Sequence, residues 1–156
     1  MYKLLPSFLI LIASFSICAA EFTNVPMKEK GTATYYITAK VAGYNVDLLV
    51  DTGAGYSTLN KKLLKKLKRS GHAHRVGKIE TVLANGSFCE LPVYRITSMN
   101  LGGKCILKDI KVAETPGNSR SLLGLTALRK AAPFTFSLSP DELKLSNCLA
   151  TIAESN

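Results

Sequence analysis

Histidine is scarce in this sequence, and internal repeats are absent. The 156 residues include only two histidines, His72 and His74. They lie two positions apart, and no third residue follows at a spacing typical of a metal site, so we expect a surface loop and no metal there. No repeat is long enough to fold as a unit, and the only low-complexity stretch is a run of lysines. These absences exclude a repeat array and leave one domain's length of chain.

The first twenty residues differ in composition from the rest. Lys3 precedes an apolar run over residues 4–17, and Cys18-Ala19-Ala20 closes it with small residues. This order is typical of a secretory signal peptide over residues 1–20, cleaved after Ala20. One alternative is an uncleaved membrane anchor. The other is a lipoprotein, although Ile17 before Cys18 is bulkier than lipidation sites usually allow. In each case we expect residues 21–156 outside the cytoplasm, periplasmic or secreted, with a membrane partner only if the segment is retained.

Few cysteines remain after such cleavage, namely Cys89, Cys105 and Cys148. In an oxidising compartment two of the three are expected to pair. We expect Cys105 with Cys148, which would join a mid-chain strand to the last strand, although the sequence alone leaves the pairing open. A nucleophilic cysteine working with a histidine is the other use of these residue types, but no local signature accompanies them.

Acidic residues are outnumbered, with 11 against 20 basic ones. Without Lys3 the 19 remaining basic residues give a charge of +8. Six of them fall between Lys61 and Arg69, where leucines recur at helical spacing. Asn60 before this run is a good helix N-cap, and Ser70-Gly71 after it is a typical helix end. This basic run therefore predicts the solvent-exposed face of a short amphipathic helix. Nucleic-acid binding is not expected, because nothing aromatic or glycine-rich accompanies the charge; an anionic surface is the remaining alternative.

Short segments in which apolar and polar residues alternate dominate the rest of the chain. They predict a mainly β fold with one or two short helices. Residues 21–31 are expected to be a polar lead-in and residues 149–156 a tail. Asn85-Gly86 between two strand-like runs indicates a hairpin. The expected strands are 32–41, 46–51, 79–83, 88–96, 99–101, 105–113, 121–124, 134–138 and 143–145.

The most informative stretch is Leu48–Thr58. An apolar strand ends at Asp51, and Thr52-Gly53-Ala54 continue as a tight turn. Gly53 allows a backbone conformation or a close approach that a side chain would forbid. A carboxylate held at the end of a buried strand is a candidate catalytic group, although Asp and Gly are also ordinary turn residues.

The chain resembles the retropepsin-like (retroviral-type) aspartic proteases, especially their exported bacterial members. The resemblance rests on Asp51-Thr52-Gly53-Ala54 after an apolar strand, on Ser57 and Thr58 close behind, and on the downstream Leu122-Leu123-Gly124. It implies a closed acid-protease-like β-barrel over residues 32–148, one lobe per chain, in a homodimer. A larger basic helix and three cysteines depart from the compact viral enzymes.

The resemblance also implies roles for particular residues. Each chain would supply one catalytic Asp51, and the pair would share a proton and activate water to cleave a peptide or protein substrate, with no cofactor or metal. Thr52 would support the dimer, and Gly53 and Ala54 would shape the active-site turn. Leu122, Leu123 and Gly124 would form the supporting strand, and Ala84, Asn85, Gly86 and Ser87 the flap. The alternative function is a catalytically silent barrel that acts as an extracytoplasmic binding module.

Overall fold

The structure is a computed structural model that describes residues 21–31, 33–82 and 86–149. Its helices are short: α1 (Lys61–Arg69), α2 (Leu125–Leu128) and the 3-10 turn η1 (Arg129–Ala131). Its strands are β1 (Thr23–Pro26), β2 (Lys28–Glu29), β3 (Tyr35–Val41), β4 (Tyr44–Val50), β5 (Ser57–Asn60), β6 (Ala73–Val82), β7 (Phe88–Leu101), β8 (Cys105–Thr115), β9 (Ser121–Leu123), β10 (Phe134–Leu138) and β11 (Asp141–Leu145).

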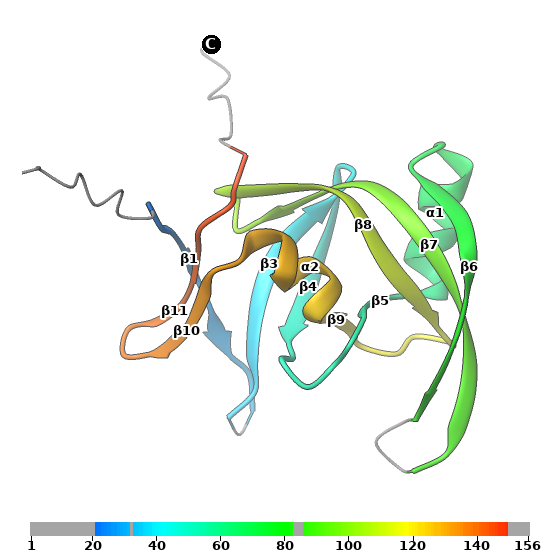
Figure 1. Cartoon of the computed structure of the whole chain (residues 1–156), viewed down its shortest axis with the longest axis horizontal. Coiled ribbons are helices and arrows are strands. Elements are labelled where there is room, and N and C mark those ends of the chain that lie inside the picture. The colour runs from blue at the N-terminus through cyan, green and yellow to red at the C-terminus, as the bar shows by residue number, and fades with distance from the viewer. Residues whose placement is uncertain (1–20, 32, 83–85, 150–156) are drawn as a thin grey trace, which may run out of the picture.

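Six strands close into a barrel, which confirms the predicted fold class. The order is β3-β4-β9-β5-β8-β7, and β7 returns to β3 through the pairing of Leu101 with Ala39. Closure removes the open edges that a flat sheet of this size would present. β2 continues the sheet beyond β3, and β6 continues it beyond β7. Figure 1 shows these strands wrapping around a common interior.

Large aliphatic side chains fill the barrel. Residues from most barrel strands are fully buried, among them Ile37, Leu48, Leu59, Ile96, Met99, Leu101, Ile110 and Leu123. Because side chains alternate along a strand, each of these strands also carries an outward face. The interior is therefore a packed core, which fixes the ends of the strands that carry the turn at Asp51.

Helix α1 covers one side of the barrel as the leucine spacing predicted. The side-chain Oδ1 of Asn60 accepts a hydrogen bond from the backbone N–H of Leu63, at 2.9 Å, which caps the first turn. Leu64 and Leu67 are fully buried, while the lysines face outward. The predicted amphipathic helix, its cap and its end at Ser70 are confirmed.

A second, three-stranded sheet lies beside the barrel in the order β1-β11-β10. It includes part of the segment that the sequence prediction left outside the domain as a polar lead-in. Val25 is fully buried and Met27 is 6% exposed, so residues 23–29 belong to the fold. The sheet brings the start of the described chain against its end, as Figure 1 shows at the left.

Several predicted element boundaries were wrong. His72 lies before the strand, but Ala73 and His74 are not in a loop: β6 begins at Ala73, which is buried and pairs with Ile96. The first predicted strand begins at Tyr35 rather than residue 32, and the runs at 88–96 and 99–101 are one strand, β7. Leu149 forms a bridge with Ile106.

The expected signal peptide, Ala84 and Asn85 of the expected hairpin tip, and residues 150–156 of the tail lie outside the described residues. Within the described ranges, every helix is too short or too polar to cross a membrane.

Candidate active site

The candidate site is the turn that follows β4, built around Asp51. Strand β4 is held on one side by antiparallel β3 and on the other by parallel β9, up to the pairing of Val50 with Leu123. The backbone N–H of Asp51 continues that contact by donating to the carbonyl oxygen of Leu123, at 3.1 Å. The carboxylate therefore starts from a backbone position fixed by two neighbouring strands.

The carboxylate is held by the turn itself. Its Oδ1 accepts hydrogen bonds from the backbone N–H groups of Gly53 and Ala54, at 3.0 and 3.1 Å. A Cβ on Gly53 would lie 3.3 Å from the same oxygen, a tight approach that glycine avoids. Oδ2 makes no hydrogen bond to the described residues and remains open to solvent or a ligand. The turn thus orients Asp51 and leaves one oxygen available for chemistry.

Gly124 lies directly behind this turn, as the downstream Leu-Leu-Gly motif predicted. A Cβ added to it would lie 2.4 Å from the carbonyl oxygen of Tyr56 and 2.8 Å from that of Ala54. Both are backbone atoms, so no side-chain rotation could relieve the overlap. Glycine is required here by close approach of two backbone segments.

Ser57 joins these two segments by hydrogen bonds. Its buried hydroxyl donates to the Gly124 carbonyl at 3.2 Å and accepts from the Gly124 N–H at 3.0 Å. The Leu125 N–H also donates to the carbonyl of Ala54, at 2.9 Å. The strand carrying Leu122, Leu123 and Gly124 therefore braces the loop after Asp51.

Thr126 is a site-supporting residue that the sequence reasoning missed. Its Oγ1 accepts a hydrogen bond from the backbone N–H of Ser57, at 2.9 Å, across 69 positions of sequence. The available signal was its place two residues after Gly124, at the start of a short helix. Thr52, by contrast, is exposed on the outer side of the turn, where its predicted role toward a second chain remains a prediction.

The hairpin predicted as a flap is present where the structure describes it. β6 and β7 pair up to Val82 and Phe88, with Gly86 and Ser87 leading into β7. Phe88 is 85% exposed and Val82 is 57% exposed, an unusual surface for apolar side chains. Figure 1 shows this end of the hairpin and the turn after β4 at the same lower edge of the molecule.

The remaining candidates are the cysteines and the histidines. Cys105 and Cys148 form the predicted disulfide, while Cys89 on β7 is a free, half-buried thiol. His72 Nδ1 lies 3.2 Å from the Thr97 hydroxyl. Over the described part of the chain, no three His, Cys, Asp or Glu side chains form a group that could hold a metal ion.

Comparison with solved structures gives a match in fold. A crystal structure of a retropepsin-like aspartic protease from Rickettsia conorii aligns with a TM-score of 0.57 and 23% sequence identity. The alignment covers 84% of this chain and 95% of the Rickettsia chain. No curated protein sequence matches this one.

Comparison with protein families identifies the group. The family described as "gag-polyprotein putative aspartyl protease" matches residues 37–130, which is more than half of the chain and contains both Asp51 and Gly124. The chain therefore belongs to the retroviral-type aspartyl protease family.

Proposed function

We propose that the protein is an aspartic endopeptidase that works as a homodimer, with one Asp51 from each chain. The observation that carries the proposal is the hydrogen bonding of the Asp51 carboxylate. Its Oδ1 accepts from two backbone N–H groups, while Oδ2 accepts no hydrogen bond from the described residues. The fold and family support peptide hydrolysis. One chain holds one such turn, so a two-fold arrangement supplies the second carboxylate.

The chemistry follows from the electrostatics of two carboxyl groups at close range. Two like charges about 3 Å apart cannot both ionise, so the pair holds one proton. The ionised carboxylate takes a proton from water as the water oxygen bonds to the peptide carbonyl carbon, and the protonated one donates to the carbonyl oxygen. Proton transfer to the amide nitrogen then accompanies cleavage of the C–N bond.

The supporting residues would keep this geometry fixed. Gly53 and Ala54 hold Oδ1, while Gly124 and Ser57 prevent the loop from moving away from β9. A rigid carboxylate needs no reorganisation when charge shifts during the reaction. Thr52, on the outer side of the turn, is placed in this proposal against the partner's turn.

The test compares two matched substitutions, one on β4 and one in the turn that follows it. Asp51→Asn should abolish cleavage of unfolded peptide substrates by residues 21–156, measured across about pH 3 to 8. Asp47→Asn is the control, because Asp47 lies four residues earlier and bonds Lys30 and Thr38 instead. Circular dichroism should show both variants folded. Cleavage that persists in Asp51→Asn contradicts the proposal, and a wild-type protein that is inactive and monomeric at all concentrations favours the binding module.

We further propose that the protein is exported after cleavage at Ala20. The disulfide between Cys105 and Cys148 supports an oxidising compartment. Protein recovered from the exported fraction should begin at Glu21 by N-terminal sequencing. Recovery only in the cytoplasm, with residues 1–20 intact, would contradict this part of the proposal.

A further inference from the structure

A hollow lies on the barrel far from Asp51, between the beginning of β4 and helix α1. Its volume is about 290 Å³. Strand β4 pairs with β9 only from Leu48 onward, so its first half has no strand neighbour on the α1 side. Asn45 and Asp51 are six residues apart on this extended strand, which places the hollow about 20 Å from the catalytic turn.

The hollow has an apolar floor. Tyr44, Val46 and Leu63 line it, and all three are half-buried and packed against the core. The polar residues of the lining are Asn45, Asn60, Lys62 and Lys66. With four polar and three apolar residues, the lining is more polar than that of most small-molecule sites, which suits a charged ligand.

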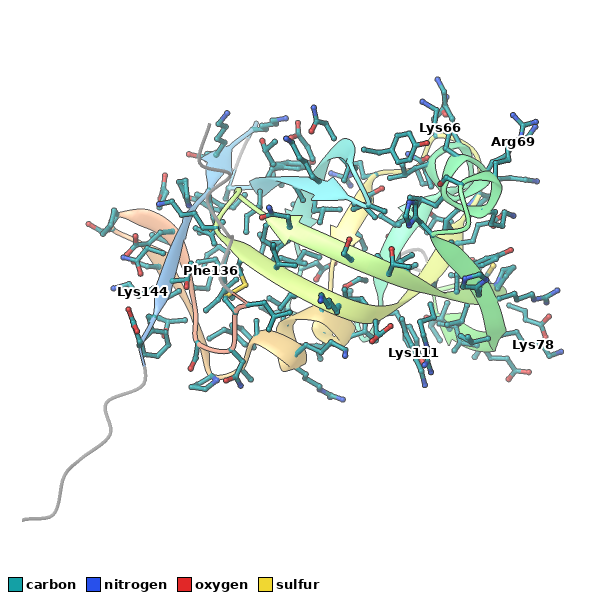
Figure 2. The ribbon with its side chains drawn as sticks, turned by 90° about the horizontal axis from the view of Figure 1, so that it is seen from above. Lys66, Arg69, Lys78, Lys111, Phe136 and Lys144 are labelled. Carbon is teal, nitrogen blue, oxygen red and sulfur yellow. A yellow bond between two sulfur atoms is a disulfide. The ribbon has the colours of Figure 1, made fainter. Side chains whose placement is uncertain are left out.

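Lys62 and Lys66 can only donate hydrogen bonds, and Asn60 has a donor to offer. The Oδ1 of Asn60 is occupied by the Leu63 N–H, so the amide NH₂ of Asn60 is the part left for a ligand. Lys66 Nζ lies 5.7 Å from the centre of the Tyr44 ring, within cation–π range, which holds the ammonium over the hollow. Figure 2 shows Lys66 projecting from α1 at the end of the molecule away from Lys144.

No acid balances these charges within the lining. Asp47, on the same strand, bonds Lys30 and Thr38, and Glu114 lies against Lys68. Among the described residues neither Lys62 nor Lys66 forms an ion pair. Two uncompensated ammonium groups and the amide NH₂ of Asn60, beside an apolar floor, are complementary to an anion with a hydrophobic part.

We propose that this hollow binds an organic carboxylate with a small apolar body. At about 30 Å³ for each water-sized group, it has room for roughly ten non-hydrogen atoms. The carboxylate lies between Lys62 and Lys66, and the apolar part rests on Tyr44, Val46 and Leu63. A free small acid and the C-terminus of a peptide are the two sources of such a carboxylate, because both present the same group.

The experiment uses matched acid and amide probes. Phenylacetate is compared with phenylacetamide, and acetyl-Gly-Phe acid with its C-terminal amide, by NMR titration of the purified protein. We expect each bound acid to shift signals of Tyr44, Val46 and Leu63, and its amide to bind at least about tenfold more weakly. Tighter binding of phenylacetate indicates a free acid, and tighter binding of the peptide acid indicates a peptide C-terminus.

Single substitutions distinguish a specific binding site from general electrostatic attraction to the basic helix α1. Lys66→Met should weaken acid binding at least about fivefold, while Lys65→Met, on the same helix but outside the lining, should leave it unchanged. Asp51→Asn should also leave it unchanged, so this proposal can fail or succeed apart from the catalytic one. Equal binding of acid and amide, equal loss in both lysine variants, or no shift at about 10 mM of either acid would overturn it. Displacement of the acid by sulfate at equal ionic strength would overturn it too.

Discussion

The disulfide between Cys105 and Cys148 should make a large contribution to stability. It joins the start of β8 to the segment after β11 and lies next to the reciprocal backbone hydrogen bonds between Ile106 and Leu149. It therefore ties the three-stranded sheet to the barrel. Reducing it removes this link while leaving every side chain in place, which makes the reduced wild-type protein a better comparison than a substituted one.

The expected magnitude follows from the loop that the bond closes. The two cysteines are 43 residues apart. In the chain-entropy treatment, a loop of this length lowers the entropy of the unfolded chain by about 13 cal/mol/K, or about 4 kcal/mol at 25 °C. Cys89→Ala, which leaves the disulfide intact, should change the free energy of unfolding by less than about 1 kcal/mol.

The assay is urea unfolding of oxidised and reduced protein at one fixed protein concentration, because a dimer's stability depends on concentration. Alkylation of denatured, unreduced protein should label one thiol, that of Cys89. A loss of less than about 1 kcal/mol on reduction would refute the reasoning about the closed loop. Labelling of all three mature cysteines would refute the pairing itself.

Two further predictions concern Gly124 and the ion pair of Asp47. Gly124→Ala should destabilise the protein by about 3 kcal/mol or more, because its Cβ overlaps the carbonyl oxygens of Tyr56 and Ala54; a thermal unfolding midpoint within about 2 °C of wild type would contradict this. The hydrogen bond from Lys30 lowers the pKa of Asp47, so their interaction stabilises the fold above the ordinary Asp pKa and is lost as pH falls through the lowered one. Lys30→Met should therefore cost about 0.5 kcal/mol more near pH 7 than at a pH below the lowered pKa of Asp47, and a cost that does not change with pH would be the contrary result.

Local signals allowed the elements around the site to be predicted. Asn60 and the leucine spacing defined α1 because capping and amphipathicity act within a few residues. The turn at Asp51 was readable for the same reason, since strand, acid and glycine are contiguous. The motif Leu122-Leu123-Gly124 predicted a supporting strand, but the need for glycine at position 124 comes from close approach to the carbonyl oxygens of Tyr56 and Ala54, which only the folded chain reveals.

Features that depend on distant partners were not predictable in this way. Val25 and Met27 flank Pro26 and precede charged residues, and β1 exists because β11, about 120 positions later, pairs with it. Ala73 begins a strand because Ile96 lies opposite, although the flanking histidines suggested a loop. Thr126 accepts a hydrogen bond from Ser57, 69 positions earlier, and its place two residues after Gly124 does not by itself identify that partner.

The central claim is that one Asp51 is half of an active site, and subunit mixing tests it most directly. A fixed amount of wild-type protein is equilibrated with increasing amounts of Asp51→Asn protein, and peptide cleavage is measured. If both carboxylates are required, exchange of subunits into inactive mixed dimers lowers the activity, to about half at an equal amount of variant. Activity that stays constant as the variant is added, while subunits are shown to exchange, would contradict the account.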